Sequence, residues 1–250
     1  MGNISSQDMF KIFDASVKPI LCYGSHIWGY QYVDRIEKVH IKFCKKLCLL
    51  SCNTCDFLAL GECGRLPLCI TYMSNCVKYW LHVVRMNNNR YPKQCYYMLF
   101  RMDETGKTTW ATYVKNLLFS YGFGHVLIVH DVGNIDEFLK AFSQRIKDCY
   151  TQKWFADLNE SPKALHYRYF KSMLTPELYL NTDLSYIQKK TLSNFRCSSH
   201  DLMVEKGRYL KIEREQRFCQ LCKQLNFNII EDEYRFFRMQ KLPTAAQYVF

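Results

Sequence analysis

The chain of 250 residues has no apolar run that approaches the ~18 residues needed to cross a bilayer as a helix. Its first eight residues also lack the basic region and the apolar run of a secretory signal. No stretch shows the sustained period-two alternation of a half-buried strand. These absences exclude a membrane span and predict an intracellular protein, cytoplasmic or nuclear, with little β-sheet.

Motifs that mark common catalytic sites are missing as well. There is no P-loop, no G-x-S-x-G and no HExxH. The one cluster of acids, Glu231-Asp-Glu233, is interpreted as the acidic first turn of a helix, where the helix dipole favours negative charge. The histidines form no catalytic constellation, and we expect His40 to be a packed, hydrogen-bonded core residue. The sequence therefore predicts that the chain is not an enzyme by itself.

Cysteine, aromatic side chains and positive charge are abundant instead. Thirteen cysteines without a secretory signal predict a reducing compartment and free, mostly buried thiols. Hydrophobic residues make up 48% and aromatics 16%, which excludes a disordered chain. The start from Met1 to Ser6 matches the N-myristoylation pattern. Whether Met1 is the true start and whether Gly2 is acylated both stay open.

The formal net charge is +11, and it is distributed unevenly. Residues 121–180 hold seven Lys/Arg against seven Asp/Glu, whereas residues 61–120 hold eight against three. Residues 181–250 hold twelve against eight. A basic surface favours polyanionic partners, because each phosphate that it neutralises releases condensed counterions. From charge alone, a surface that only keeps the chain soluble is an equal alternative.

Helical periodicity dominates the hydrophobic pattern. Apolar positions recur three and four residues apart over residues 33–50, at Val33, Ile36, His40, Phe43, Leu47 and Leu50. We expect this seam to pack against Trp80 or its neighbours. The other side of the same helix is expected to present a stripe of ammonium groups from Lys38, Lys42, Lys45 and Lys46.

Further helices are expected over residues 68–86, 110–121, 138–154 and 183–192. Gly29 is expected to end the helix that begins at Pro19. Residues 87–107 are expected to form a loop, and a short hairpin near residues 203–212 is the one candidate for sheet. The class is mainly α, in three parts that cover residues 1–90, 91–194 and 195–250.

A series of residues near the C-terminal end suggests a family. It reads Phe195-Arg-Cys-Ser-Ser-His-Asp-Leu-Met-Val-Glu-Lys-Gly-Arg-Tyr209, then Arg217-Phe-Cys-Gln-Leu-Cys222 and Glu231-Asp-Glu-Tyr234. This order resembles the extreme C-terminus of LINE-type (non-LTR, jockey-like) retrotransposon reverse transcriptases. Earlier blocks resemble the thumb and the following region of that family, in the same order, at residues 17–29, 61–68, 78–80, 170–171 and 177–180. The family usually carries an acid where His26 stands.

The resemblance implies a helical thumb-like bundle over residues 1–90 and a helical C-terminal region over residues 91–194. It implies a small, basic, degenerate zinc-knuckle-like tail over residues 195–250. It also implies that two parts of the family are missing: the endonuclease, and the palm, whose clustered carboxylates hold two metal ions. The chain would then be a nucleic-acid-binding fragment of an RNA-directed DNA polymerase without its own polymerase or endonuclease chemistry. The alternatives are a domesticated protein–protein module with a partner on the exposed thumb face, and a non-functional relic.

Metal binding is the weaker of two candidate site types. Cys219-x2-Cys222 has the spacing of a zinc knuckle, but tetrahedral zinc needs four ligands. In the family that the chain resembles, a His and a Cys complete the site where this chain has Arg235 and Gln240. Cys197-x2-His200 offers an alternative pair, with spacing similar to a zinc ribbon. We expect no cofactor, and zinc on these four residues is left open as the alternative.

Two sets of basic residues are candidates for a nucleic-acid interface. The first is the lysine stripe over residues 38–46, for which a solvated helix face is the alternative. The second is a run that also contains aromatic residues, and its cations are Arg196, Lys206, Arg208, Lys211, Arg214 and Arg217. Arginine forks suit phosphates, and aromatic faces stack on unpaired bases. The resemblance places this run near template and target strands, so the expected partner is single-stranded RNA or DNA, or an RNA–DNA hybrid.

Overall fold

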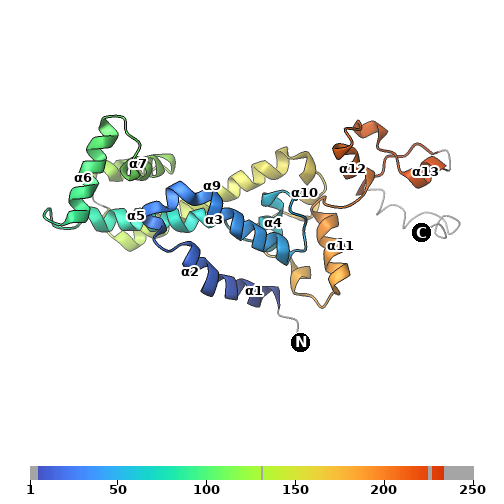
Figure 1. Cartoon of the computed structure of the whole chain (residues 1–250), viewed down its shortest axis with the longest axis horizontal. Coiled ribbons are helices and arrows are strands. Elements are labelled where there is room, and N and C mark those ends of the chain that lie inside the picture. The colour runs from blue at the N-terminus through green and yellow to red at the C-terminus, as the bar shows by residue number, and fades with distance from the viewer. Residues whose placement is uncertain (1–4, 131, 225–226, 234–250) are drawn as a thin grey trace.

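The structure, a computed structural model, describes residues 5–130, 132–224 and 227–233. Figure 1 shows an elongated, mainly helical molecule. The first elements are α1 (Ser6–Ile12), the π-helical turn η1 (Phe13–Val17), α2 (Lys18–Leu21), α3 (Ser25–Leu47), α4 (Asp56–Cys63), α5 (Cys69–Val84), α6 (Tyr91–Glu104), α7 (Trp110–Ser120) and α8 (Gly124–Val129). The others are α9 (Ile135–Glu160), η2 (Pro162–Ala164), α10 (Tyr167–Phe170), η3 (Leu178–Asn181), α11 (Tyr186–Arg196), α12 (Met203–Tyr209), η4 (Arg214–Gln216) and α13 (Gln220–Gln224). None of the helices in these ranges is both long and apolar enough to cross a membrane.

Three long helices, α3, α5 and α9, run along the long axis of the molecule (Figure 1). Helix α5 packs against both α3 and α9. Gly29 lies inside α3 and permits this packing, since a Cβ there would lie 3.2 Å from the Cβ of Tyr72 on α5. The prediction that Gly29 ends a helix is wrong. The chain instead separates α2 from α3 at Gly24, whose φ of 66° suits a residue without a Cβ.

Two large apolar clusters lie along this axis. One surrounds Trp80 and includes Phe142 and Ile146 of α9, together with residues of α6, α7 and α8. The other surrounds Trp154, nearer the C-terminal end of α9, and includes Cys44 of α3. The predicted packing of the 33–50 seam against Trp80 or its neighbours is wrong in its partner. Helix α3 does pack on α5, but Ile36 groups with Leu68 and Tyr72 near the start of α5. Leu47 and Leu50, at the other end of the seam, belong to the cluster around Trp154. Helix α9 contributes to both clusters and joins the two ends of the molecule.

The helices expected from periodicity are present as α5, α7, α9 and α11. The loop expected over residues 87–107 is wrong in its middle, where Tyr91–Glu104 forms α6. Pro92 stands in the first turn of α6, where its missing N–H leaves no helical bond unmade. The hairpin expected near residues 203–212 is also wrong, because Met203–Tyr209 forms α12.

The last described residues form a small unit at the end of the molecule opposite α6 and α7 (Figure 1). An isolated antiparallel bridge joins Phe218 to Ile230. On either side of it, the Cys219 amide donates to the Ile229 carbonyl and the Glu231 amide donates to the Arg217 carbonyl, both at 2.9 Å. This pairing, and not a hairpin at 203–212, is the sheet-like contact of the described tail.

Candidate nucleic-acid interface

The outer side of α3 carries a row of exposed cations, here called the α3 cationic face: Arg35, Lys38, Lys42 and Lys46. The buried residues Ile36, His40 and Cys44 lie on the other side of the helix. With 3.6 residues per turn, the four cations fall within an arc of about 80° and extend over about 16 Å of helix axis. None of them makes an ion pair with another described residue. Their charges are therefore free to meet an anionic partner.

Lys45, the remaining lysine of the predicted stripe, does not belong to this exposed face and instead contacts residues of its own chain. Its Nζ lies 2.7 Å from Oδ1 of Asp56 and donates to the carbonyl of Cys52 at 2.8 Å. Its side chain is 12% exposed, against 58% for Asp56. Lys45 therefore ties the end of α3 to the start of α4, while Arg35, which sequence reasoning missed, joins the exposed face.

An aromatic ring lies beside the α3 cationic face. The guanidinium carbon of Arg35 lies 5.8 Å from the ring centroid of Tyr32, within cation–π range. Tyr32 is 45% exposed. Proteins that bind single strands combine such rings, on which bases stack, with cations that follow the backbone.

Glu37 fixes the inner side of α3. Its Oε1 lies 2.9 Å from Nδ1 of His40, and its Oε2 accepts a hydrogen bond from the amide of Cys69 at 3.3 Å. Because Cys69 begins α5, Glu37 joins the two helices. His40 is fully buried, so the prediction of a packed, hydrogen-bonded core residue is confirmed. This anchorage keeps the cationic side of α3 turned outward.

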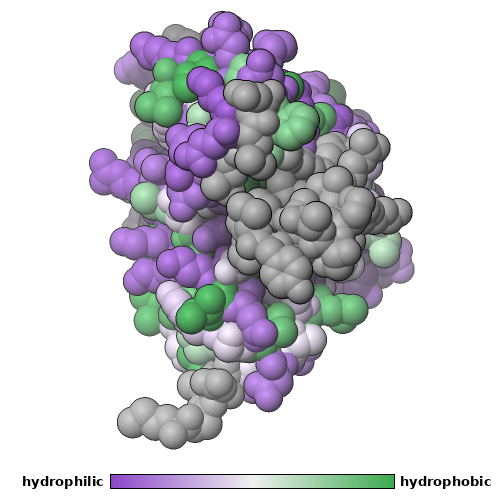
Figure 2. Space-filling view, turned by 90° about the vertical axis from the view of Figure 1, so that its right-hand side faces the viewer, coloured by the Kyte–Doolittle hydropathy of each residue, from purple (hydrophilic) through white to green (hydrophobic). Residues whose placement is uncertain are grey.

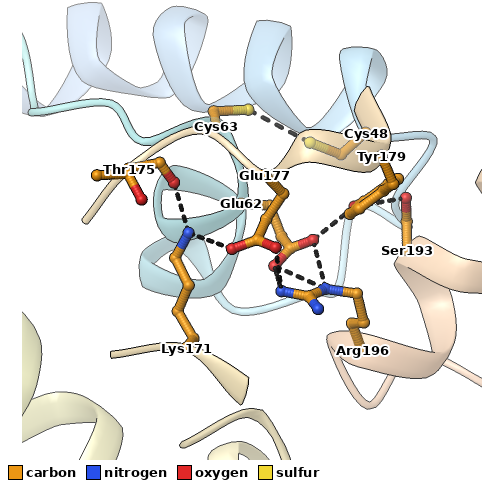
Figure 3. A network of polar contacts seen from close by, with 9 residues as sticks. All are labelled: Cys48, Glu62, Cys63, Lys171, Thr175, Glu177, Tyr179, Ser193 and Arg196. Atoms are coloured by element: carbon orange, nitrogen blue, oxygen red, sulfur yellow. Dashed lines mark hydrogen bonds and ion pairs between the residues drawn. The ribbon is translucent and has the colours of Figure 1, made fainter. Parts of the chain in front are cut away.

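Arg196 is held by a buried network, which Figure 3 shows between α4, α11 and the segment before η3. Its Nε and Nη2 donate to Glu62 at 3.0 and 2.9 Å, and Nη2 lies 2.8 Å from Oε2 of Glu177. Glu62 is fully buried. Burial alone would lower the pKa of Arg196, but these carboxylates outweigh it and raise the pKa above its usual range. Arg196 thus neutralises a buried charge.

Further polar contacts complete this network (Figure 3). The Tyr179 hydroxyl donates to Oε2 of Glu62 at 2.5 Å, and Nζ of Lys171 donates to Oε1 of Glu177 at 2.5 Å. Burial and the Glu62 charge raise the pKa of Tyr179, so its hydroxyl remains a donor. The network therefore joins α4, η3 and α11 into one unit.

Arg217, in the C-terminal basic run, holds the tail together. Its Nε donates to the carbonyl of Ile212 and its Nη1 to the carbonyl of Val204, both at 2.9 Å. The side chain passes directly over Gly207, where a Cβ would lie only 2.6 Å from the Cγ and Cδ of Arg217. A glycine at position 207 is needed for this contact.

The other cations of the tail differ in exposure. Arg208 is half-buried, donates to the carbonyl of Pro162 at 3.0 Å and lies 3.3 Å from Glu205. The exposed cations are Lys206, Lys211 and Arg214. Lys206 has a loose contact, 3.7 Å, with an exposed carboxylate. Figure 2 looks onto this end of the molecule, where hydrophilic residues cover most of the coloured surface and hydrophobic ones form small groups.

The predicted basic residues therefore divide into two groups. One group has partners within the chain: Lys45, Arg196, Arg208 and Arg217. The other group points outward, on α3 and on the exposed part of the tail. The chain matches no family model, no curated protein and no solved structure. The function of the chain is therefore inferred from these residues and their geometry.

The predicted metal ligands have separate surroundings. Cys219 and Cys222 are buried in the tail, whereas Cys197 belongs to the cluster around Trp154. Both ring nitrogens of His200 are engaged: Nε2 lies 2.9 Å from a carboxylate oxygen of Glu233, and Nδ1 accepts from a backbone amide at 3.4 Å. In this arrangement His200 has no free nitrogen for a metal.

Among the residues that the structure describes, no three His, Cys, Asp or Glu are grouped so that they could hold a metal ion. Arg235 and Gln240, where the family that the chain resembles has its last two ligands, lie outside the described residues. The alternative of zinc on Cys197, His200, Cys219 and Cys222 therefore has no such group of ligands among the described residues.

Glu233 connects the end of the described tail to the segment before α10, a role that the sequence did not indicate. Its two carboxylate oxygens lie 2.8 Å from Nε2 of His166 and 2.9 Å from Nε2 of His200. Burial alone would raise the pKa of Glu233, but the hydrogen bonds from both histidines outweigh it and lower the pKa. Nearby, Glu231 accepts from the amide of Met203 at 2.8 Å, at the start of α12. Two acids of the 231–233 cluster thus have specific long-range partners.

Proposed function

We propose that this chain binds single-stranded RNA or DNA, or an RNA–DNA hybrid, through the α3 cationic face. Four exposed cations on one side of a rigid helix, without an ion-pair partner among the described residues, carry this proposal. In a stacked helix each strand places a phosphate about every 3.4 Å of helix axis. A face about 16 Å long is therefore long enough to contact several phosphates of one strand. Tyr32 adds a surface on which a base stacks.

The exposed cations of the tail, Lys206, Lys211 and Arg214, form the second part of the proposed interface. Arg196, Arg208 and Arg217 are proposed to support it from within, because their donors already serve carboxylates or carbonyls. Contacts to phosphates and stacking carry little sequence information. The expected binding is therefore tolerant of sequence.

The resemblance to LINE-type reverse transcriptases supplies a context for this activity. In that context the chain is the thumb and C-terminal region, and it holds a template–primer backbone inside a cell. Nucleotide transfer belongs to a palm, which supplies the carboxylates for two metal ions. We propose no polymerase or endonuclease chemistry for this chain, and no zinc requirement.

Fluorescence anisotropy with labelled single strands of two unrelated sequences, over a series of salt concentrations, tests the proposal. The two strands should bind with similar affinity, and log Kd should rise linearly with log salt, since each phosphate contact releases counterions. A Kd that does not change with salt concentration, or no binding at low ionic strength, would contradict an interface built on phosphate contacts. Template-directed extension by the isolated chain would contradict the absence of catalysis.

A protein partner is the second candidate, and one observation favours it. Ile20, Tyr23 and Ile27, at the end of α2 and the start of α3, are 76%, 83% and 54% exposed. Exposed apolar residues this close in sequence are typical of docking surfaces. Serine at Ile20 and Tyr23 should leave nucleic-acid affinity unchanged. If it abolished that affinity, the apolar residues and not the cations would be the binding surface.

A further inference from the structure

A pocket of about 470 Å³ lies between α2, α5 and α9. Its walls come from Lys18, the loop over residues 64–68, one side of α5 and two residues of α9. No residue of the α3 cationic face lines it, and none of its described lining residues is an acid. The pocket is therefore a separate site with a positive wall.

Three cations line this pocket. Lys18 and Lys147 are half-buried and have no hydrogen-bond or ion-pair partner for their ammonium groups among the described residues. Arg65, the third, donates from Nη1 to Oδ2 of Asp14 at 2.7 Å. Its hydrogen bonds lower the pKa of Asp14, with a smaller contribution from Lys18, so the carboxylate stays ionised and offsets the Arg65 charge. Two positive charges remain without a counter-ion at contact distance.

Neutral donors converge on the same pocket. The Oγ of Ser74 is buried and has no hydrogen-bond partner within the described chain. Thr71, Asn75 and Ser143 add hydroxyl and amide groups to the lining. Ammonium and hydroxyl donors around an acid-free hollow match the acceptor oxygens of a phosphate group. A buried hydroxyl without a partner is the polar group that a ligand in the pocket would satisfy.

The wall formed by residues 64–68 is held in place. Gly64 has a φ of 59°, and a Cβ there would lie 2.1 Å from the backbone nitrogen of Pro176. The amide of Arg65 donates to the carbonyl of Leu60 at 2.9 Å. The loop is therefore fixed on α4 and on the segment before η3. A site that is already formed binds its ligand without first ordering a loop.

We propose that this pocket binds a phosphate group, with Lys18 and Lys147 as its charge partners and Ser74 as a hydroxyl donor. The group is either a free phosphate, such as inorganic phosphate or pyrophosphate, or the terminal phosphate of a nucleic-acid strand. Both sources present the same oxygens to the same donors. The site does not depend on the function proposed for the α3 cationic face.

Thermal unfolding of the full chain in pyrophosphate, against sodium chloride at equal ionic strength, is the test. Pyrophosphate should raise the Tm in a concentration-dependent way, because a ligand that binds the folded state stabilises it by mass action. Lys18→Gln and Lys147→Gln should each weaken binding about tenfold, the equivalent of one charge-assisted hydrogen bond. Lys153→Gln, on the same helix as Lys147 but outside the pocket, is the matched control and should bind normally. Ser74→Ala should weaken binding without changing the net charge, which general charge attraction does not predict.

Two results would overturn this inference. One is an equal Tm in pyrophosphate and in chloride, together with equal affinity for 5′-phosphorylated and 5′-hydroxyl strands. The other is unchanged binding by Lys18→Gln, Lys147→Gln and Ser74→Ala, each shown to be folded by circular dichroism. If the terminal phosphate of a strand is the ligand, only the 5′-phosphorylated strand competes with pyrophosphate. Failure of the α3 proposal is distinguishable, because glutamine at Lys38 and Lys42 leaves pyrophosphate binding intact.

Discussion

Arg196→Met should lower the free energy of unfolding by about 3 kcal/mol. Removing one partner of a buried ion pair costs about 3–5 kcal/mol, because the remaining charge stays out of water without its counter-charge. Here that charge is on Glu62, which is fully buried. The lower end of the range applies, since Tyr179 still donates to Glu62 and Glu177 keeps its contact with Lys171. Urea unfolding with an unchanged m-value measures the difference.

The double variant Glu62→Leu/Arg196→Met separates the ion pair from simple loss of packing. Removing both charges should recover most of the lost stability, because no unpaired charge is left in the interior. Arg196→Met within about 1 kcal/mol of the wild type would refute the reasoning. So would a double variant no more stable than Arg196→Met alone. The folded double variant should also retain its affinity for single strands, since Arg196 supports the interface without touching it.

Three further predictions concern the loop, the docking of the tail, and zinc. Gly64→Ala should destabilise the chain by about 3 kcal/mol, from left-handed strain and from the overlap with Pro176; an unchanged urea midpoint would contradict this loop position. The Glu233 carboxylate should contribute stability that is present above pH 4.5 and is lost as the pH falls through its lowered folded-state pKa. Glu233→Gln should therefore flatten the acid side of a Tm–pH profile, and parallel profiles would argue against the histidine contacts. The purified chain should retain no stoichiometric zinc after gel filtration, whereas zinc that is lost in both Cys197→Ser and His200→Ala would support the ribbon.

Much of the helical fold could be predicted, because burial leaves a period of 3.6 residues in the sequence. Helices α5, α7 and α9 carry long apolar stripes, and the predicted bounds are nearly correct for α5 and α7. Helix α9 extends beyond the predicted residues 138–154 at both ends. Helix α6 was missed because Tyr96 is its one buried residue and Pro92 indicated a loop. The prediction of mostly buried thiols without disulfides also agrees with the described residues, where seven of the thirteen cysteines are buried and no disulfide joins any two.

The candidate sites could be predicted from the sequence only where all of their residues lie on one face of a single helix. Lys38, Lys42 and Lys46 are exposed because they lie opposite an apolar seam, and that can be read from spacing. Arg196 is different, since its partner Glu62 lies 134 positions away and no local pattern links the two. The pocket lined by Lys18 and Lys147 is a further case, because its polar groups come from four separate segments that only the fold brings together.

The salt dependence of single-strand binding, compared between two triple variants, tests the proposed function most directly. Glutamine at Lys38, Lys42 and Lys46 removes three cations from the α3 cationic face. The matched control places glutamine at the exposed α9 residues Lys140, Arg145 and Lys153. Each variant lowers the formal net charge by three, from +11 to +8, so general attraction to a polyanion falls equally.

Each phosphate neutralised on a single strand contributes about −0.7 to the slope of log affinity against log salt. The α3 variant should therefore bind with a slope that is less steep by about 2, and the α9 control should keep the wild-type slope. Both variants should retain the helical circular dichroism of the wild type. Equal slopes for the two variants, whether both changed or both unchanged, would contradict an interface on α3.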